Sequence, residues 1–355
     1  MEKRIERLRD NLKEKGAGGA IITSFQNRFY YSGFSGSAGY LIVTTDNQYI
    51  VTDTRYTIQV KEQAKGFCLI SAPESDYSKI AKTAANEGIT AFCYEDEALS
   101  VANFTQMQSL LTGIELIPFQ NSITEQRAVK DAEEIKSIRE ALRLADEAFL
   151  YTVSHIKVGM RETEVASIIE GYMRKNGAFR TSFDTIAASG IRSALPHGTA
   201  TVAEIKTGDF LVMDYGCVLD GYCSDITRTV VVGIANEKQK EIYDTVANAL
   251  LVGQMALMPT AKCADVDKKA RDIIIKAGYG EYFTHSLGHG VGIDIHEMPN
   301  LSPKSEKTLK PGNVVTVEPG IYIENFGGVR IEDMALITQK GAEILTKSTR
   351  ELLYI

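Results

Sequence analysis

The sequence predicts an α+β protein of two domains, an α/β domain over residues 1–122 and a larger domain over residues 123–355. Three observations lead to this fold class. The 355 residues are enough for two separate hydrophobic cores. Short apolar runs alternate with helical patterns in the first domain, which is typical of an α/β arrangement. The second domain instead carries a long amphipathic helix and then two copies of a repeated strand pattern, which indicates a duplicated fold.

The first domain is expected to begin with a helix, because Ile5, Leu8 and Leu12 recur at helical spacing and Gly16 provides a stop. A turn-like Asp-Asn-Gln break at 46–48 separates two apolar runs, which predicts a hairpin. In full, the domain is predicted to contain strands at 19–23, 40–45, 49–53, 67–71 and 90–95, with further helices from about 57 and over 78–87.

The second domain is expected to begin after a polar, charged linker at 121–130. Asp131 followed three residues later by Glu134 resembles a capping box at the start of a helix. Apolar residues then recur every three or four positions as far as Val153, so one long amphipathic helix is predicted. Further helices are expected at about 162–176 and within 236–276.

An internal repeat places four carboxylates at equivalent positions. Residues 208–216 (GDFLVMDYG) match residues 312–320 (GNVVTVEPG), and in each copy an apolar strand ends in an acid. A second acid lies four residues after a later glycine in each copy. The four acids are Asp214, Asp225, Glu318 and Glu332. A single buried acid is more often satisfied by backbone amides or an arginine, but four acids in a duplicated pattern favour a site for hard divalent metal ions.

Four of the five histidines fall in the loops and strands of the second domain, at His197, His285, His289 and His296. Three of these lie within twelve residues and are flanked by glycines that permit close approach of the backbone. This clustering indicates a functional site. His155 on the long helix is interpreted as packed or solvated.

Composition and motifs exclude several classes of function. The net charge of -7, with no long basic stripe, argues against nucleic-acid binding. No apolar stretch approaches the roughly 18 to 20 residues of a membrane span, and the charged first sixteen residues do not resemble a signal peptide. Five scattered cysteines indicate reduced thiols, so a cytoplasmic location is expected. HExxH, G-x-S-x-G and P-loop motifs are absent.

Four blocks resemble, in order, the signature blocks of the pita-bread metallopeptidases, in the branch that contains aminopeptidase P and prolidase. The blocks are MDYGCVLDGYCSDITRT at 213–229, GHGVGIDIHE at 288–297, VEPGIY at 317–322 and GVRIEDM at 328–334. The resemblance covers nearly the whole chain and implies a pita-bread (creatinase/aminopeptidase) catalytic domain with a creatinase-like N-terminal α/β domain. It implies that two divalent metal ions per subunit are bound by Asp214, Asp225, His289, Glu318 and Glu332.

The same resemblance implies roles around those ions. Asp225 and Glu332 would bridge the two ions, and a shared hydroxide would attack the scissile carbonyl. The implied catalytic residues are His197, His296 and Glu318, and the implied substrate contacts are His197, His285, His296 and Arg330. Four carboxylates with one imidazole form a hard ligand set, which favours manganese over cobalt or zinc.

The expected activity is hydrolysis of the Xaa-Pro bond at the N-terminus of peptides, by a homodimer whose N-terminal domain restricts substrate length. A strict Xaa-Pro dipeptidase (prolidase) remains open, because both activities resemble the catalytic half equally well. The stretches 32–39 and 52–56 resemble aminopeptidase P. Methionine aminopeptidase usually lacks the N-terminal domain, creatine amidinohydrolase does not use this metal set, and non-enzymatic binding modules of this fold typically lose a ligand.

Overall fold

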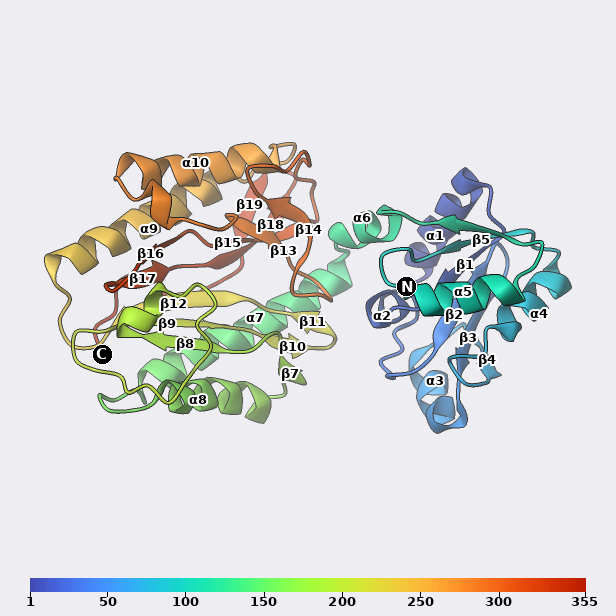
Figure 1. The fold of residues 1–355 in the computed structure, drawn as a ribbon, viewed down its shortest axis with the longest axis horizontal. Coiled ribbons are helices and arrows are strands. Elements are labelled where there is room, and N and C mark those ends of the chain that lie inside the picture. Colours follow the sequence, from blue (N-terminus) through green and yellow to red (C-terminus); the bar gives the residue numbers. More distant parts are fainter. The chain divides into compact units, whose positions relative to one another are not determined.

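The computed structural model describes residues 1–355, and the chain forms two compact units, Met1–Arg127 and Ala128–Ile355 (Figure 1). The sequence predicted a linker at 121–130, but this stretch contains the helix α6 (Ser122–Ala128). Ile123 is buried in this helix, and the guanidinium of Arg127 donates to Asn27 at 3.0 Å. These contacts attach α6 to the first compact unit, which extends to Arg127. No helix combines the length and the apolar character needed to cross a membrane.

The first unit is a six-stranded sheet with helices. The strand order is β4-β3-β2-β1-β5-β6. Strand β2 is antiparallel to both β1 and β3, whereas β4 is parallel to β3, β5 to β1 and β6 to β5. The strands are β1 (Gly19–Ile22), β2 (Tyr40–Thr44), β3 (Gln48–Thr52), β4 (Cys68–Ser71), β5 (Ala91–Tyr94) and β6 (Glu115–Pro118). The helices are α1 (Glu2–Lys15), α2 (Phe25–Ser32), α3 (Thr57–Gln63), α4 (Ser78–Glu87) and α5 (Val101–Leu110).

The predicted helix at the N-terminus and the predicted hairpin are both present in this unit. Ile5, Leu8 and Leu12 are buried along α1, and Gly16 ends the helix with a left-handed φ of 68°. The hairpin pairs β2 with β3. Helices α2 and α5 and strand β6 were not predicted. Helix α2 buries Asn27 and Arg28 beside its tyrosines, and α5 buries only Met107, so neither has a regular apolar pattern.

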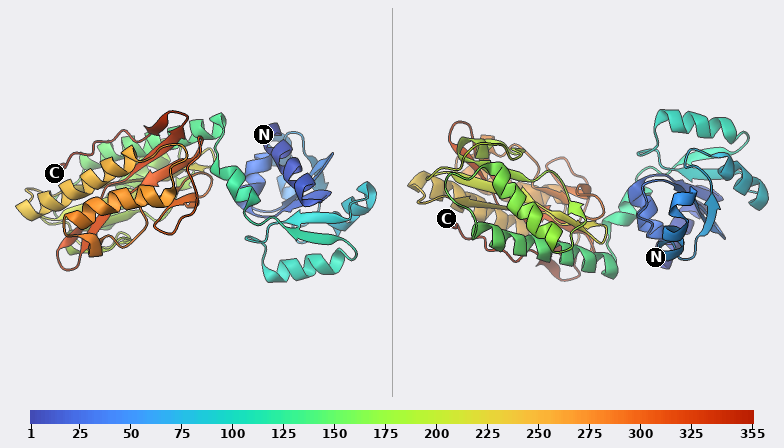
Figure 2. Two further views of the ribbon diagram at one scale, coloured as in Figure 1. Left: turned by 90° about the horizontal axis from the view of Figure 1, so that it is seen from above. Right: turned by 90° about the horizontal axis from the view of Figure 1, so that it is seen from below.

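The second unit has two pairs of helices on opposite sides of its strands (Figures 1 and 2). One pair is α7 (Ala132–Val153) with α8 (Glu162–Lys175), and the other is α9 (Glu237–Met255) with α10 (Cys263–Lys276). The predicted capping box starts α7. The Asp131 carboxylate accepts from the backbone N–H of Glu134, and the Glu134 carboxylate accepts from the backbone N–H of Asp131, both at 3.0 Å.

All strand pairs of the second unit are antiparallel. The main sheets have the orders β12-β9-β8 and β14-β13-β15-β18-β19. Their strands are β8 (Ile186–Ser189), β9 (Phe210–Tyr215), β12 (Ile226–Val231), β13 (Gly288–Gly290), β14 (Glu297–Leu301), β15 (Val314–Val317), β18 (Asp333–Thr338) and β19 (Gly341–Ile344). Smaller sheets contain β7 (Arg180–Thr181), β10 (Cys217–Leu219) and β11 (Tyr222–Cys223), and the pair β16 (Gly320–Ile323) with β17 (Gly327–Arg330).

The repeat seen in the sequence corresponds to a structural duplication. Gly208 and Gly312 stand before β9 and β15 with the same left-handed φ of 92°. The first acid of each copy lies at the end of its strand, and the second acid directly precedes β12 in one copy and β18 in the other. Each copy therefore delivers its two carboxylates from an antiparallel pair of strands, and both pairs lie between the two pairs of helices (Figure 1).

Candidate metal centre

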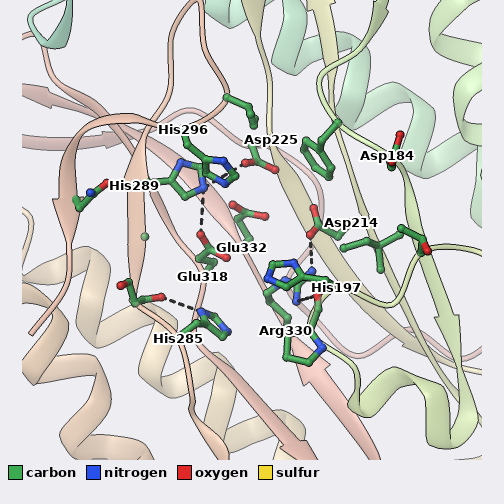
Figure 3. Close-up of a pocket in the computed structure, with 18 residues that line it drawn as sticks. Asp184, His197, Asp214, Asp225, His285, His289, His296, Glu318, Arg330 and Glu332 are labelled. Atoms are coloured by element: carbon green, nitrogen blue, oxygen red, sulfur yellow. Dashed lines mark hydrogen bonds and ion pairs between the residues drawn. The ribbon is translucent and has the colours of Figure 1, made fainter. Parts of the chain in front are cut away.

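The four acids of the repeat meet in one cavity of about 570 Å³ in the second unit. Asp214 belongs to β9 and Glu318 directly follows β15. Asp225 and Glu332 directly precede β12 and β18. Figure 3 shows Asp225, Glu332 and Glu318 pointing toward one another, with Asp214 beside them.

The chain approaches itself closely at the glycines that accompany these residues. A Cβ at Gly216, two residues after Asp214, would lie 1.8 Å from the backbone oxygen of Ser224. A Cβ at Gly288 would lie 2.1 Å from the backbone oxygen of Thr316. Only glycine permits these approaches, which bring the acid of β9 near the loop before β12, and β13 near β15.

His289 lies in the middle of β13, and its ring faces the acids. Its Nε2 atom is 3.3 Å from Glu318 Oε1 and 3.6 Å from Asp225 Oδ2. Its Nδ1 atom lies 3.1 Å from the carbonyl oxygen of Gly290. A hydrogen on Nδ1 that is donated to this carbonyl leaves the lone pair of Nε2 directed at the cluster, which is how a second interaction orients a metal-binding histidine.

The cluster has the properties of a cation site. Ligand atoms of Asp225, His289 and Glu332 all lie within 4.8 Å of one another. Asp214 Oδ1 and Glu332 Oε1 are buried and have no hydrogen-bond partner. An unsatisfied buried acceptor costs about 1–3 kcal/mol, and a bound cation would remove this cost. Carboxylate oxygens with one imidazole nitrogen are a donor set that fits hard divalent metal ions.

The pKa values reflect this crowding of negative charge. Burial, together with the charges of neighbouring acids, raises the pKa of Asp225 and that of Glu332 well above the ordinary range of a carboxyl group. Burial also raises the pKa of Asp214, against the opposing effect of Arg330. For Glu318, burial is outweighed by the hydrogen bond and charge of His289, which lower its pKa to about 2.

A buried chain of hydrogen bonds leads away from Asp214. The guanidinium of Arg330 donates to Asp214 Oδ2 and, at 2.8 Å, to the hydroxyl of Tyr322. That hydroxyl lies 3.0 Å from His285 Nε2, and His285 Nδ1 is 2.8 Å from the carbonyl oxygen of Ser286. Burial lowers the pKa of His285, which favours the neutral ring. The chain therefore fixes the orientation of His285 and of Arg330.

The cavity also contains the other residues singled out in the sequence. His197 and His296 are exposed side chains of its wall, and His285 and Arg330 line it as well. The His296 ring stands edge-to-face against that of His289 with centroids 4.3 Å apart. Partial burial within the cavity, together with the charge of His289, lowers the pKa of His296. All predicted site residues are thus brought to one cavity, whereas His155 lies on the exposed surface of the second unit and does not line it.

Three residues of this region were not assigned a role from the sequence. Thr227 donates to Glu332 Oε2 at 2.7 Å, Tyr322 links Arg330 to His285, and the carbonyl of Pro196 accepts from Arg330 at 2.9 Å. Thr227 and Tyr322 lie inside the recognised blocks 213–229 and 317–322. Their position in those blocks was the available signal, but hydrogen-bond partners that come from other strands and loops cannot be read from a sequence pattern.

Comparison with known proteins gives consistent matches. Residues 136–339 match the metallopeptidase family M24, and residues 4–129 match the creatinase/prolidase N-terminal domain. The Xaa-Pro dipeptidase of Pyrococcus furiosus is 41% identical, over 99% of this chain and 100% of that protein. The structure of an Xaa-Pro dipeptidase from Bacillus anthracis has a TM-score of 0.96 and 41% identity, and the match covers 100% of this chain and 99% of that one. The X-Pro aminopeptidase structure from Thermotoga maritima MSB8 has a TM-score of 0.91 and 36% identity, over 96% and 98% of the two chains.

Proposed function

The chain belongs to metallopeptidase family M24, and from this membership we propose that it is a metal-dependent exopeptidase that hydrolyses the Xaa-Pro bond at the N-terminus of peptides. The observation that carries the proposal is the convergence of four carboxylates and His289 on one cavity, with two buried carboxylate oxygens that have no protein partner. Relatives named Xaa-Pro dipeptidase or X-Pro aminopeptidase match along nearly the entire chain.

The proposed metal ligands are Asp214, Asp225, His289, Glu318 and Glu332. The set would hold two divalent cations per subunit, and its four carboxylates favour manganese, with cobalt or zinc as alternatives. Such cations, when bound, would activate water as a nucleophile at neutral pH and polarise the scissile carbonyl.

The protein groups around the cations have separate tasks in this proposal. Glu318 takes a proton from the nucleophile and returns it to the leaving nitrogen. His296 and His197 contact the substrate around the scissile carbonyl, and His285 contacts it from the Tyr322 side.

Aminopeptidase activity is the first choice over a strict dipeptidase. A dipeptidase has to bind the free carboxylate of its substrate, for which a bidentate arginine is the usual means. Arg330 is the one arginine or lysine that lines the cavity, and each nitrogen of its guanidinium donates to a protein group. These bonds use four of the five N–H hydrogens of the guanidinium, so Arg330 has one N–H left and cannot form a bidentate pair with a substrate carboxylate. Dipeptidase activity is the second candidate, because relatives such as the Pyrococcus protein carry that name.

The experiment is a comparison of three substrates with the same manganese-loaded protein. We expect release of the first residue from Ala-Pro-Ala-Ala, with slower or no hydrolysis of Ala-Pro. Hydrolysis of Ala-Pro alone would replace the aminopeptidase assignment with the dipeptidase one. Failure on both, with release of methionine from Met-Ala-Ala, would contradict the specificity for proline.

We further propose a homodimer in the cytoplasm, with peptides that carry proline at the second position as substrates. The N-terminal unit would supply oligomer contacts and restrict substrate length. The cytoplasmic proposal is supported by five free cysteines, of which four are buried.

A further inference from the structure

His197 belongs to a segment that joins β8 to β9 and carries no long element of its own. We call residues 189–201 the His197 loop; they include the short 3₁₀ helix Gly190–Ala194. His197 is exposed in the cavity wall, and no side-chain hydrogen bond fixes its ring. The position of His197 therefore depends on how the backbone of the loop is held.

A single buried carboxylate holds both ends of this loop. Glu162, the first residue of α8, is completely buried. Its Oε1 atom accepts from the backbone N–H of Ser189 at 2.7 Å and from the Ser189 hydroxyl at 3.0 Å. Its Oε2 atom accepts from the backbone N–H of Thr201 at 3.0 Å and from the Thr201 hydroxyl at 2.7 Å. Bonds to a charged acceptor are stronger than neutral ones, and the helix N-terminus favours the negative charge.

The middle of the loop is attached to the same carboxylate through an arginine. Arg192 Nε lies 3.0 and 3.2 Å from the two carboxylate oxygens of Glu162, and Arg192 Nη2 donates to the carbonyl oxygen of Thr199 at 2.9 Å. On the cavity side, Arg330 donates to the carbonyl oxygen of Pro196 at 2.9 Å. The backbone on either side of His197 is thus fixed by Glu162 through Arg192 and by Arg330.

The other copy of the duplicated unit shows that the fold does not require this carboxylate. The backbone N–H of Glu162 donates to the carbonyl of Ala203, and in the second copy that of Cys263 donates to the carbonyl of Lys307. The neighbouring bridges Arg161↔Glu204 and Lys262↔Thr308 correspond in the same way. Cys263 therefore occupies the position of Glu162, and α10 forms there without an acid.

We infer that Glu162 is a positioning residue, which holds the His197 loop so that His197 meets the substrate. This inference rests on the proposed function for its catalytic part. These bonds of Glu162 and Arg192, which we call the clamp, are present only in the copy with the His197 loop, where the pairing beside His197 is a single β-bridge between Thr199 and Ile186. In the second copy, His289 is fixed by the pairing of β13 with β14 and β15.

The first test is a double-mutant cycle with Glu162→Gln and His197→Ala in the manganese-loaded protein. We expect Glu162→Gln to lower kcat about tenfold or more and to change KM by less than about threefold. The reason is that the loop positions His197, whose contact with the substrate matters most in the transition state. In the His197→Ala background the same substitution should change kcat by less than about twofold, because residues that act through one another are not additive. Multiplicative effects of the two substitutions would overturn the inference.

The matched control is Asp146→Asn. Asp146 is also a buried carboxylate, and it accepts from the backbone N–H groups of Lys347 at 2.9 Å and Ser348 at 2.8 Å. Lys347 and Ser348 do not line the cavity, so Asp146→Asn should lower Tm and change kcat much less than Glu162→Gln does. A loss of kcat no larger in Glu162→Gln than in this control would also overturn the inference.

The second test is independent of activity. Hydrogen–deuterium exchange should accelerate in residues 190–200 of Glu162→Gln while Asp146→Asn leaves that segment protected. If Glu162→Gln does not fold, Arg192→Gln replaces it, because the Arg192 side chain is 29% exposed and its removal leaves the other bonds of Glu162 in place. Unchanged exchange of the loop would contradict the clamp. A wild-type protein inactive on Xaa-Pro peptides but with accelerated exchange in the variant would contradict the proposed function and support the clamp.

Discussion

Asp225 and Glu332 are carboxylates that the fold keeps in an unfavourable environment. Their exposed fractions are 4% and 1%, and burial together with neighbouring acids raises the pKa of each. Without a cation, both groups favour the protonated form. Such an arrangement reduces the stability of the metal-free protein and increases its affinity for a divalent ion, which is a common compromise at functional sites.

The raised pKa values predict how metal binding depends on pH. In the metal-free protein, these two groups contribute their full stabilisation below the ordinary carboxyl pKa of about 4. This contribution is lost as pH rises through their raised native pKa values. Manganese binds the ionised forms, so the rise in Tm on adding manganese should be larger at pH 8 than at pH 5. Calorimetry with manganese and with EDTA measures this difference. An equal or larger rise at pH 5 would refute the assignment.

Replacement of Asp225 by asparagine should separate stability from activity. Asparagine needs neither to bury a charge nor to take up a proton on folding, so metal-free Asp225→Asn should melt above the metal-free wild type, by about 2–4 °C for each kcal/mol in a domain of this size. Its Tm should no longer rise with manganese, and kcat/KM should fall by about two orders of magnitude or more. Thr227→Val is a comparison variant, since it removes a hydrogen bond to Glu332 but no proposed ligand. Near-native activity of Asp225→Asn would show that Asp225 is not a shared ligand.

At the scale of elements, regular patterns could be predicted and irregular ones could not. The helix α1 and the long helix α7 have apolar residues at helical spacing and recognisable end signals, and both form as expected. By contrast, α2 buries Asn27 and Arg28, which a hydrophobic pattern does not identify. The buried guanidinium of Arg28 is satisfied by the carbonyl oxygens of Gly36 and Gly39, a tertiary contact with no local signal.

The candidate site was predictable for a similar reason. The duplication placed Asp214 and Glu318 at matching strand ends, so their convergence followed from the repeat. The contacts that orient the site were not predictable, because they join distant parts of the chain. Glu162 is an example, since it lies in a helix start that the sequence marks only as charged.

The strand β14 carries an ion pair that supports His296, and its loss should be costly. Lys130 Nζ lies 2.5 Å from Glu297 Oε1, and the two side chains are 1% and 8% exposed. Removing one partner of a buried pair costs about 3–5 kcal/mol, so Lys130→Met should reduce the free energy of unfolding by that amount. The double variant Lys130→Met/Glu297→Leu should recover part of it. Urea unfolding measures all three, and a change below about 1 kcal/mol in Lys130→Met would contradict the structural role of the pair.

At the scale of the whole molecule, the chain combines two units with different tasks. The second unit contains every proposed metal ligand, whereas the first unit is an α/β sheet domain that matches the creatinase/prolidase N-terminal domain. The catalytic half accounts for metal-dependent hydrolysis. The length of the substrate has to be restricted by the surroundings of the cavity, and we propose that the N-terminal unit does this.

Association of two chains is the prediction that belongs to this scale. A homodimer predicts a light-scattering mass of twice the 39.0 kDa chain, unchanged on dilution across the micromolar range. A mass of a single chain at all concentrations would exclude the dimer. The same sample should be assayed for peptidase activity, so that the mass refers to the active form.

The most direct test of the account is a manganese titration of metal-free protein, with bound metal and hydrolysis of Ala-Pro-Ala-Ala measured together. A catalytic centre with two metal ions should be inactive in the metal-free protein, and its activity should rise as manganese binds and saturate at two ions per chain. Asp225→Asn and Glu332→Gln should bind fewer ions and remain inactive under the same conditions. Full activity without bound metal, or unchanged metal binding and activity in both variants, would contradict the account.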